Sequence, residues 1–219
     1  MKNLLVTKLP GLVDLRLLVL VLVPLLMGKA CEVDVTDQKV ADTAREVNAV
    51  FRQEYQGMLS DIGTRHFDID RQTAFTAMKH TLESLGFRNI STEADYYISG
   101  YAAAPLPLDD KDWQKAMIKD EPVLKKIAVK HLGIKGNFAS FEPEGLEIHG
   151  IITLIDNDAK GGVDISITMR MQEIKPQPPE SILPRRDYPP PAAVRMGFEK
   201  VWHFFEVQAL PMAKVAGKS

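Results

Sequence analysis

The sequence predicts an α+β protein in which an antiparallel sheet packs on a long C-terminal helix. Residues 146–154 and 163–172 alternate between apolar and other side chains, as strands with one buried and one wet face do. Residues 193–210 carry a bulky apolar stripe at helical spacing, and residues 71–85 carry a smaller one. Because such stripes must be buried against another layer, a sheet covered by helices is the expected architecture.

The N-terminal part of the mature chain, residues 31–63, is predicted to be a polar tether followed by a helix that ends at Gly63. The helix is indicated by apolar side chains at spacings of three and four, namely Val40, Ala44, Val47, Phe51, Tyr55 and Met58. A short strand at Phe67 and Ile69 follows. Asp70 is a good N-cap for the helix 71–85, and Gly86 suits a left-handed C-cap.

Residues 87–91 and 96–103 are predicted strands, and residues 104–144 are predicted to be a helical insertion. Pro105 and Pro107 end the strand before it. Asp109 is expected to cap a first short helix, and Pro122 to begin a second one. We expect the apolar side chains of this insertion to cover one face of the sheet.

The two alternating strands form a predicted hairpin with its turn at 156–162. Residues 175–192 contain seven of the fourteen prolines, a composition typical of a stiff, extended segment. Such a proline-rich strap either crosses the domain or offers an interaction surface, and loop statistics favour the crossing strap. The last helix is expected to end before Pro211, leaving a tail at 211–219. The predicted order over the single domain 64–210 is therefore β-α-β-β-(αα)-β-β-α.

Composition excludes several classes of protein. The 219 residues are 45% hydrophobic and 26% charged, which rules out a disordered chain and a protein with many membrane spans. The 27 Lys and Arg residues do not exceed the 29 Asp and Glu residues, so a nucleic-acid partner is not expected. The single cysteine excludes an internal disulfide and a multi-cysteine metal site.

Residues 1–30 have the pattern of a signal peptide. Lys2 and Lys8 precede an apolar run of eleven residues from 17 to 27, and small residues follow it. A retained membrane anchor is the alternative, but a spanning helix needs about 20 apolar residues. Extending the run backwards meets Arg16 and Asp14. Removal of this segment, whose net charge is +3, would leave a mature chain of −2 − 3 = −5.

Cys31 lies at the predicted cleavage point and is the candidate lipidation residue. The segment from Leu25 to Cys31 resembles the lipobox of bacterial lipoproteins, in which the cysteine is acylated and becomes the new N-terminus. Ala30 matches that pattern, whereas Gly28 and Lys29 depart from it. Ordinary signal-peptidase cleavage would instead leave a free thiol. Glu32 follows the cysteine, and in the sorting rule of enteric bacteria a residue other than Asp at this position indicates the outer membrane.

Residues 67–103 resemble domains of proteobacterial envelope lipoproteins, including those of a lipoprotein component of the β-barrel assembly machinery. The similar positions are a helix with Phe75, Ala77, Met78, Leu82 and Leu85, then Gly86-Phe87, Asp95 and Gly100. The resemblance implies a helix-grip-like fold, with the sheet wrapped on the C-terminal helix. It covers about 37 residues, and each of them has a packing role. The resemblance therefore bears on fold and compartment, and not on an activity.

No catalytic, metal or cofactor site is expected. The five histidines lack metal-ligand spacing, and nucleotide-binding or hydrolase motifs are not found in the sequence. The turn 156–162 begins like a calcium loop but has Lys160 at a ligand position, and Ile167 where a bidentate Glu is required.

The sequence thus favours a non-enzymatic lipoprotein held at the outer membrane, facing the periplasm, by a lipid on Cys31, with an envelope protein as its partner. The alternative is a soluble periplasmic or secreted carrier that binds a hydrophobic molecule or a lipid. Its cavity would lie between sheet and C-terminal helix, lined by Ile165, Met169, Phe198, Trp202 and Phe205.

Overall fold

The structure is a computed structural model that describes residues 36–175, 178 and 180–216. Its single sheet has the strand order β1-β5-β4-β3-β2, with every neighbouring pair antiparallel. The strands are β1 Thr64–Phe67, β2 Arg88–Glu93, β3 Tyr97–Ala103, β4 Leu146–Asp156 and β5 Val163–Glu173. The helices are α1 Asp37–Ile62, α2 Arg71–Ser84, α3 Asp110–Leu132, the short 3-10 helix η1 Gly133–Phe138, and α4 Pro191–Ala216. The predicted α+β class and the C-terminal helix packed on the sheet are confirmed.

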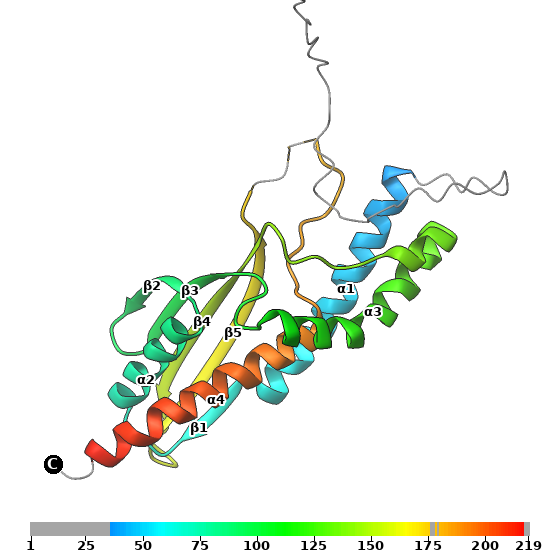
Figure 1. The fold of residues 1–219 in the computed structure, drawn as a ribbon. Helices are drawn as coiled ribbons and strands as arrows, with labels where there is room; N and C mark the ends of the chain where they lie inside the picture. Colours follow the sequence, from blue (N-terminus) through cyan, green and yellow to red (C-terminus); the bar gives the residue numbers. More distant parts are fainter. Residues whose placement is uncertain (1–35, 176–177, 179, 217–219) are drawn as a thin grey trace, which may run out of the picture.

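The main core lies between the sheet and α2 and α4, which are in front of the sheet in Figure 1. The hairpin of β4 and β5 alternates as predicted, with one buried face on each strand. The N-cap of α2 is also confirmed, because the Asp70 carboxylate accepts the Thr73 N–H at 2.8 Å. Gly86 has the expected left-handed conformation, with φ of 84°.

A pair of glycines shapes this core. Gly100 and Gly150 face each other across β3 and β4, on the buried side of the sheet. A Cβ on Gly150 would lie 2.8 Å from Cε1 of Phe87, and one on Gly100 would lie 3.5 Å from Cβ of the same residue. The missing side chain of Gly150 therefore makes room for the Phe87 ring directly against β4, and that of Gly100 for Ile90, whose Cγ1 would lie 3.2 Å from the added Cβ.

The N-terminal helix belongs to the same core. Tyr55 and Met58 of α1 are buried with the main cluster. The Tyr55 hydroxyl accepts the backbone N–H of Met169 on β5 at 3.0 Å, and the Trp202 indole donates to the carbonyl of Ile62 at 2.8 Å. The Tyr55 hydroxyl thus provides β5 with a hydrogen bond that a longer β1 would otherwise provide.

Two predicted boundaries around prolines are wrong. The insertion holds one helix, α3, with Pro122 inside it, instead of two helices. The final helix likewise continues through Pro211 to Ala216. A proline frees the carbonyl four residues earlier. That residue is Ile118 in α3 and Val207 in α4, and their exposed fractions are 72% and 57%. The freed carbonyls therefore lie where water can reach them.

The predicted placement of the insertion is also wrong, because its apolar side chains do not cover the sheet. They pack on α1, in a second cluster that contains Val47, Phe51, Leu124, Ile127, Ala128, Leu132 and Ala139, and on the start of α4. Figure 1 shows α1 and α3 side by side beyond the end of the sheet. The first strand differs as well: β1 is Thr64–Phe67, since Asp68 and Ile69 form the bend that leads into the cap of α2.

The described part of the proline-rich segment crosses α1 as a strap. Asn48 donates to the carbonyl of Arg185 at 2.7 Å, and the Tyr188 ring lies 5.9 Å from the Tyr55 ring. At its end the carboxylate of Asp120 accepts the N–H of Ala192, in the first turn of α4, at 2.9 Å. The strap therefore connects β5 to α4 by way of α1 and α3.

Candidate functional site

A groove beside the start of α3 is the candidate site. It has an apolar part and a polar part, which share Ala104, Pro105, Trp113 and Pro143. We call it the Pro105 groove. Its walls are the loop from β3 to α3, the first turns of α3, and the segment 141–144 that leads into β4.

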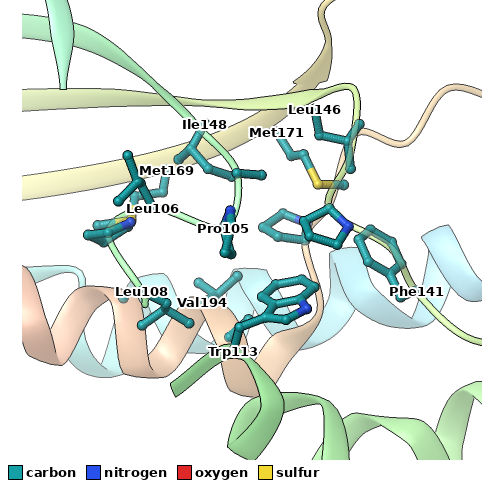
Figure 2. A pocket seen from close by; sticks show the side chains of 16 residues that line it. Pro105, Leu106, Leu108, Trp113, Phe141, Leu146, Ile148, Met169, Met171 and Val194 are labelled. Atoms are coloured by element: carbon teal, nitrogen blue, oxygen red, sulfur yellow. The ribbon is translucent and has the colours of Figure 1, made fainter. Parts of the chain in front are cut away.

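The apolar part reaches inward to the sheet and to α4. In Figure 2, Trp113 and Phe141 lie on one side of Pro105, and Leu106 and Met169 lie on the other. The Trp113 and Phe141 rings are 6.2 Å apart. The enclosed space is about 30 Å³, which is enough for one or two water molecules. This part is lined almost wholly by apolar side chains: Ala104, Pro105, Leu106, Pro107, Leu108, Trp113, Phe141, Pro143, Leu146, Ile148, Met169, Met171, Pro189, Ala193, Val194 and Gly197.

The polar part is wider, with about 260 Å³ of space. Its rim carries three carboxylates, those of Asp110, Glu142 and Glu144, together with the amide of Gln114. The residues that line it include no Lys or Arg. The groove therefore combines an apolar floor with a negatively charged rim.

Nearby cations are directed elsewhere. Arg186 donates to the backbone carbonyl of Glu142 at 3.2 Å and to the carboxylate of Glu173 at 3.4 Å. Lys200 lies 3.4 Å from Asp109. The backbone N–H of Asp112 hydrogen-bonds to Asp109 and, with Lys200, holds the pKa of that carboxyl below its usual value. Arg186 and Lys200 therefore pair with carboxylates that do not line the groove.

The five residues of the predicted carrier cavity are brought together but lie in the core. Ile165, Phe198, Trp202 and Phe205 have no exposed surface, and their side chains are part of the main cluster. Of the five, Met169 alone lines the Pro105 groove. Cys31, the predicted lipidation site, lies outside the described residues.

The histidines take part in structural contacts. His149 stacks on Tyr101 across β3 and β4, with ring centroids 4.3 Å apart, and burial together with the nearby Arg170 lowers its pKa. His66 bonds to Asp164 at 2.8 Å. Within the described residues, no three His, Cys, Asp or Glu side chains are grouped to bind a metal ion. None of the five histidines lines the groove.

The groove was not predicted from the sequence. Pro105 and Pro107 were predicted only to end a strand, and Trp113 was not among the predicted site residues. The two walls are about 30 residues apart in the chain, and no periodic pattern connects them. The one available signal was a tryptophan among carboxylates at the start of a helix, between Asp110 and Asp112 on one side and Asp120 on the other.

No protein-family model, curated protein or solved structure matches the chain. In the part of the chain that the structure describes, none of the helices has the length and hydropathy needed to cross a bilayer.

Proposed function

We propose that the chain is a non-enzymatic envelope lipoprotein, anchored through an acylated Cys31, that binds a protein partner in the Pro105 groove. The N-terminal pattern supports the anchor: a charged start, an eleven-residue apolar run, and a cysteine shortly after it. The sorting rule supports the outer membrane and a domain that faces the periplasm. The groove, with its apolar floor and acidic rim, is the observation that carries the binding role.

The partner that the groove suits is an extended peptide segment with an apolar side chain next to a basic one. The apolar side chain would contact Pro105 and Pro143, where the two parts of the groove meet. The basic side chain would lie over the Trp113 ring, a favourable site for a cation, with Glu142 and Glu144 beside it. Charge complementarity of this kind speeds association and selects partners.

The carrier alternative has less support. Drug-sized ligands occupy pockets of about 300–1,000 Å³. The apolar space in the groove is about 30 Å³, and the predicted cavity between sheet and α4 is filled by side chains. A lipid or another hydrophobic molecule would therefore require the core to open.

The anchor is tested by labelling cells with a palmitate analogue and fractionating their membranes. We expect the unchanged chain to incorporate the label and to sediment with the outer membrane. Cys31→Ser is expected to lose both properties. Equal labelling and equal sedimentation of the two chains would refute acylation at Cys31.

The groove is tested by photo-crosslinking in cells from Gln114, with Asp158 in the turn after β4 as the control position. Both residues are exposed. We expect a discrete crosslinked partner from Gln114 alone, and its loss in the double variant Glu142→Lys/Glu144→Lys. The matched control Glu83→Lys/Asp158→Lys changes the net charge equally and should keep the crosslink. The same adducts from both positions, or the same loss in both variants, would refute the role of the groove.

Trp113 also offers a direct probe of the charge at the groove. The chain has two tryptophans, and Trp202 is fully buried, so soluble quenchers report on Trp113. Because the rim is negative, the ratio of caesium quenching to iodide quenching should be higher for Trp113 than for free N-acetyltryptophanamide. In Glu142→Lys/Glu144→Lys this ratio should fall below that of the free compound, and an unchanged ratio would contradict a negative rim.

A further inference from the structure

The helices α3 and η1 carry several exposed hydrophobic side chains. Ile118, Ile134 and Phe138 have exposed fractions of 72%, 71% and 58%, and Val129 has 37%. With Val123, these make up half of the large hydrophobic residues that are exposed in the described part of the chain. Such a concentration on two consecutive elements is typical of an interaction surface.

Residues 122–138, which carry all of these side chains except Ile118, are the most basic part of the described chain, whereas Asp120 and Glu121 directly precede them. Residues 122–138 contain four lysines and no Asp or Glu, in a chain whose net charge is −2. The lysines are Lys125, Lys126, Lys130 and Lys135. We call this surface, made of Ile118, Lys126, Val129, Ile134, Lys135 and Phe138, the α3–η1 face. A helix with lysines beside exposed apolar side chains is typical of segments that lie at a membrane interface.

The α3–η1 face lies near the point where the chain emerges from the predicted anchor. Glu46 of α1 bonds to Lys130 and to His131 near the end of α3, each at 2.7 Å. Val40, in the first turn of α1, packs against the cluster that α1 and α3 share. The N-cap Thr36 is five residues after Cys31, a distance that a fully extended chain spans in about 18 Å.

We propose that the α3–η1 face rests on the headgroup layer of the membrane in which the lipid on Cys31 is inserted, and that anionic phospholipids are its ligand. This inference rests on the proposed anchor. Ile134 and Phe138 would enter the interface, and Lys126 and Lys135 would attract lipid phosphates. Lys125 and Lys130 are paired with Glu121 and Glu46. Because the mature chain is acidic as a whole, charge alone would not bring it there. The anchor supplies a high effective concentration of the membrane surface.

The test uses the full acylated chain, reconstituted in vesicles of phosphatidylcholine with phosphatidylglycerol. Phe138→Cys is labelled with an environment-sensitive fluorophore and compared with Ile155→Cys, labelled in the same way. The two native side chains are similarly exposed, at 58% and 63%. Ile155 lies near the end of β4, whereas η1 leads toward the start of that strand, so the two labels report on opposite ends of the sheet. Lipids that carry a quencher in the headgroup region report on proximity.

We expect the quenching at position 138 to exceed that at position 155 several-fold. It should fall when phosphatidylglycerol is omitted, and in the variant Lys126→Glu/Lys135→Glu. Equal quenching at both positions would overturn the proposal. The proposal would also be overturned if the label at position 138 were shielded from solvent in native membranes but not in vesicles, because this would assign the face to a protein partner.

The proposed anchor is checked separately in the same preparation. An acylated Cys31 has no thiol to label, so the chain without an added cysteine should take up no fluorophore. Labelling of that chain would refute the anchor. Absence of labelling together with equal quenching at positions 138 and 155 would refute only the membrane-facing surface.

Discussion

Replacing Tyr55 by Phe removes one oxygen atom from the buried junction between α1 and the sheet. The hydroxyl accepts the N–H of Met169, on the side of β5 where β1 has already ended. Tyr55 is only 5% exposed, so water cannot take over this role in the variant. The ring itself stays, and so does its contact with Tyr188.

The expected loss of stability follows from this geometry. A buried hydrogen bond contributes about 1 kcal/mol net, and leaving a buried donor without an acceptor costs about 1–3 kcal/mol. Because the substitution creates almost no cavity, we expect the free energy of unfolding to fall by about 2 kcal/mol. Tyr96→Phe, at a position that is 42% exposed, should change it by less than about 0.5 kcal/mol.

Urea denaturation measures the free energy of unfolding, and amide hydrogen exchange at Met169 locates the effect. Burial raises the pKa of Tyr55 above its usual value of 10.0, although the Met169 N–H partly opposes this. Ionisation therefore favours the unfolded chain, and stability should fall as the pH rises above about 10, less steeply in Tyr55→Phe. A loss below about 0.5 kcal/mol, with Met169 exchange unchanged, would refute the reasoning.

Two further predictions concern the core and the start of α4. Gly150→Ala should destabilise the fold by about 1–3 kcal/mol in urea denaturation, because its Cβ would lie 2.8 Å from the buried Phe87 ring. Gly57→Ala, on an open side of α1, should instead stabilise it, and equal effects would contradict the explanation. Burial raises the pKa of Asp120 to about 6, despite its bond to the Ala192 N–H, so its contribution to stability falls as the pH rises from about 4 to about 6. The stability of Asp120→Asn should not fall over this pH range. Above pH 6 its free energy of unfolding should exceed that of the wild type by about 1 kcal/mol, a value reduced because Asp120 is partly exposed. Parallel pH profiles of stability for the two chains would contradict this explanation.

Local sequence patterns correctly predicted the elements that depend mainly on neighbouring residues in the chain. The alternation in 163–172 predicted β5, and Asp70 and Gly86 predicted both ends of α2, because caps and strand faces depend on neighbouring residues. The two prolines misled the prediction for the opposite reason. Whether Pro122 or Pro211 ends a helix depends on what surrounds the freed carbonyl, and the sequence does not show this.

Long-range partners were the part that the sequence could not provide. Leu124, Ile127, Ala128 and Leu132 of α3 are buried as predicted, but they pack on α1 and not on the sheet, and Val123 is exposed. The Pro105 groove depends on the same information, since Trp113 and Phe141 meet only after α3 and η1 have folded back toward β4. Its carboxylates, such as Glu142 and Glu144, have no special spacing in the chain.

The two bonds from α1 to the rest of the molecule have a mechanical consequence. Any pull on the chain before Thr36 reaches α1 first, and α1 is tied to β5 through Tyr55 and to α4 through the carbonyl of Ile62. Both bonds lie in the C-terminal part of α1, so a pull from its N-terminus would first act on the turns that hold Val47 and Phe51 in the cluster shared with α3. If the chain is anchored and binds a partner as proposed, force between the two would open the contact of α1 with α3 first, and would reach the sheet only through Tyr55 and Ile62.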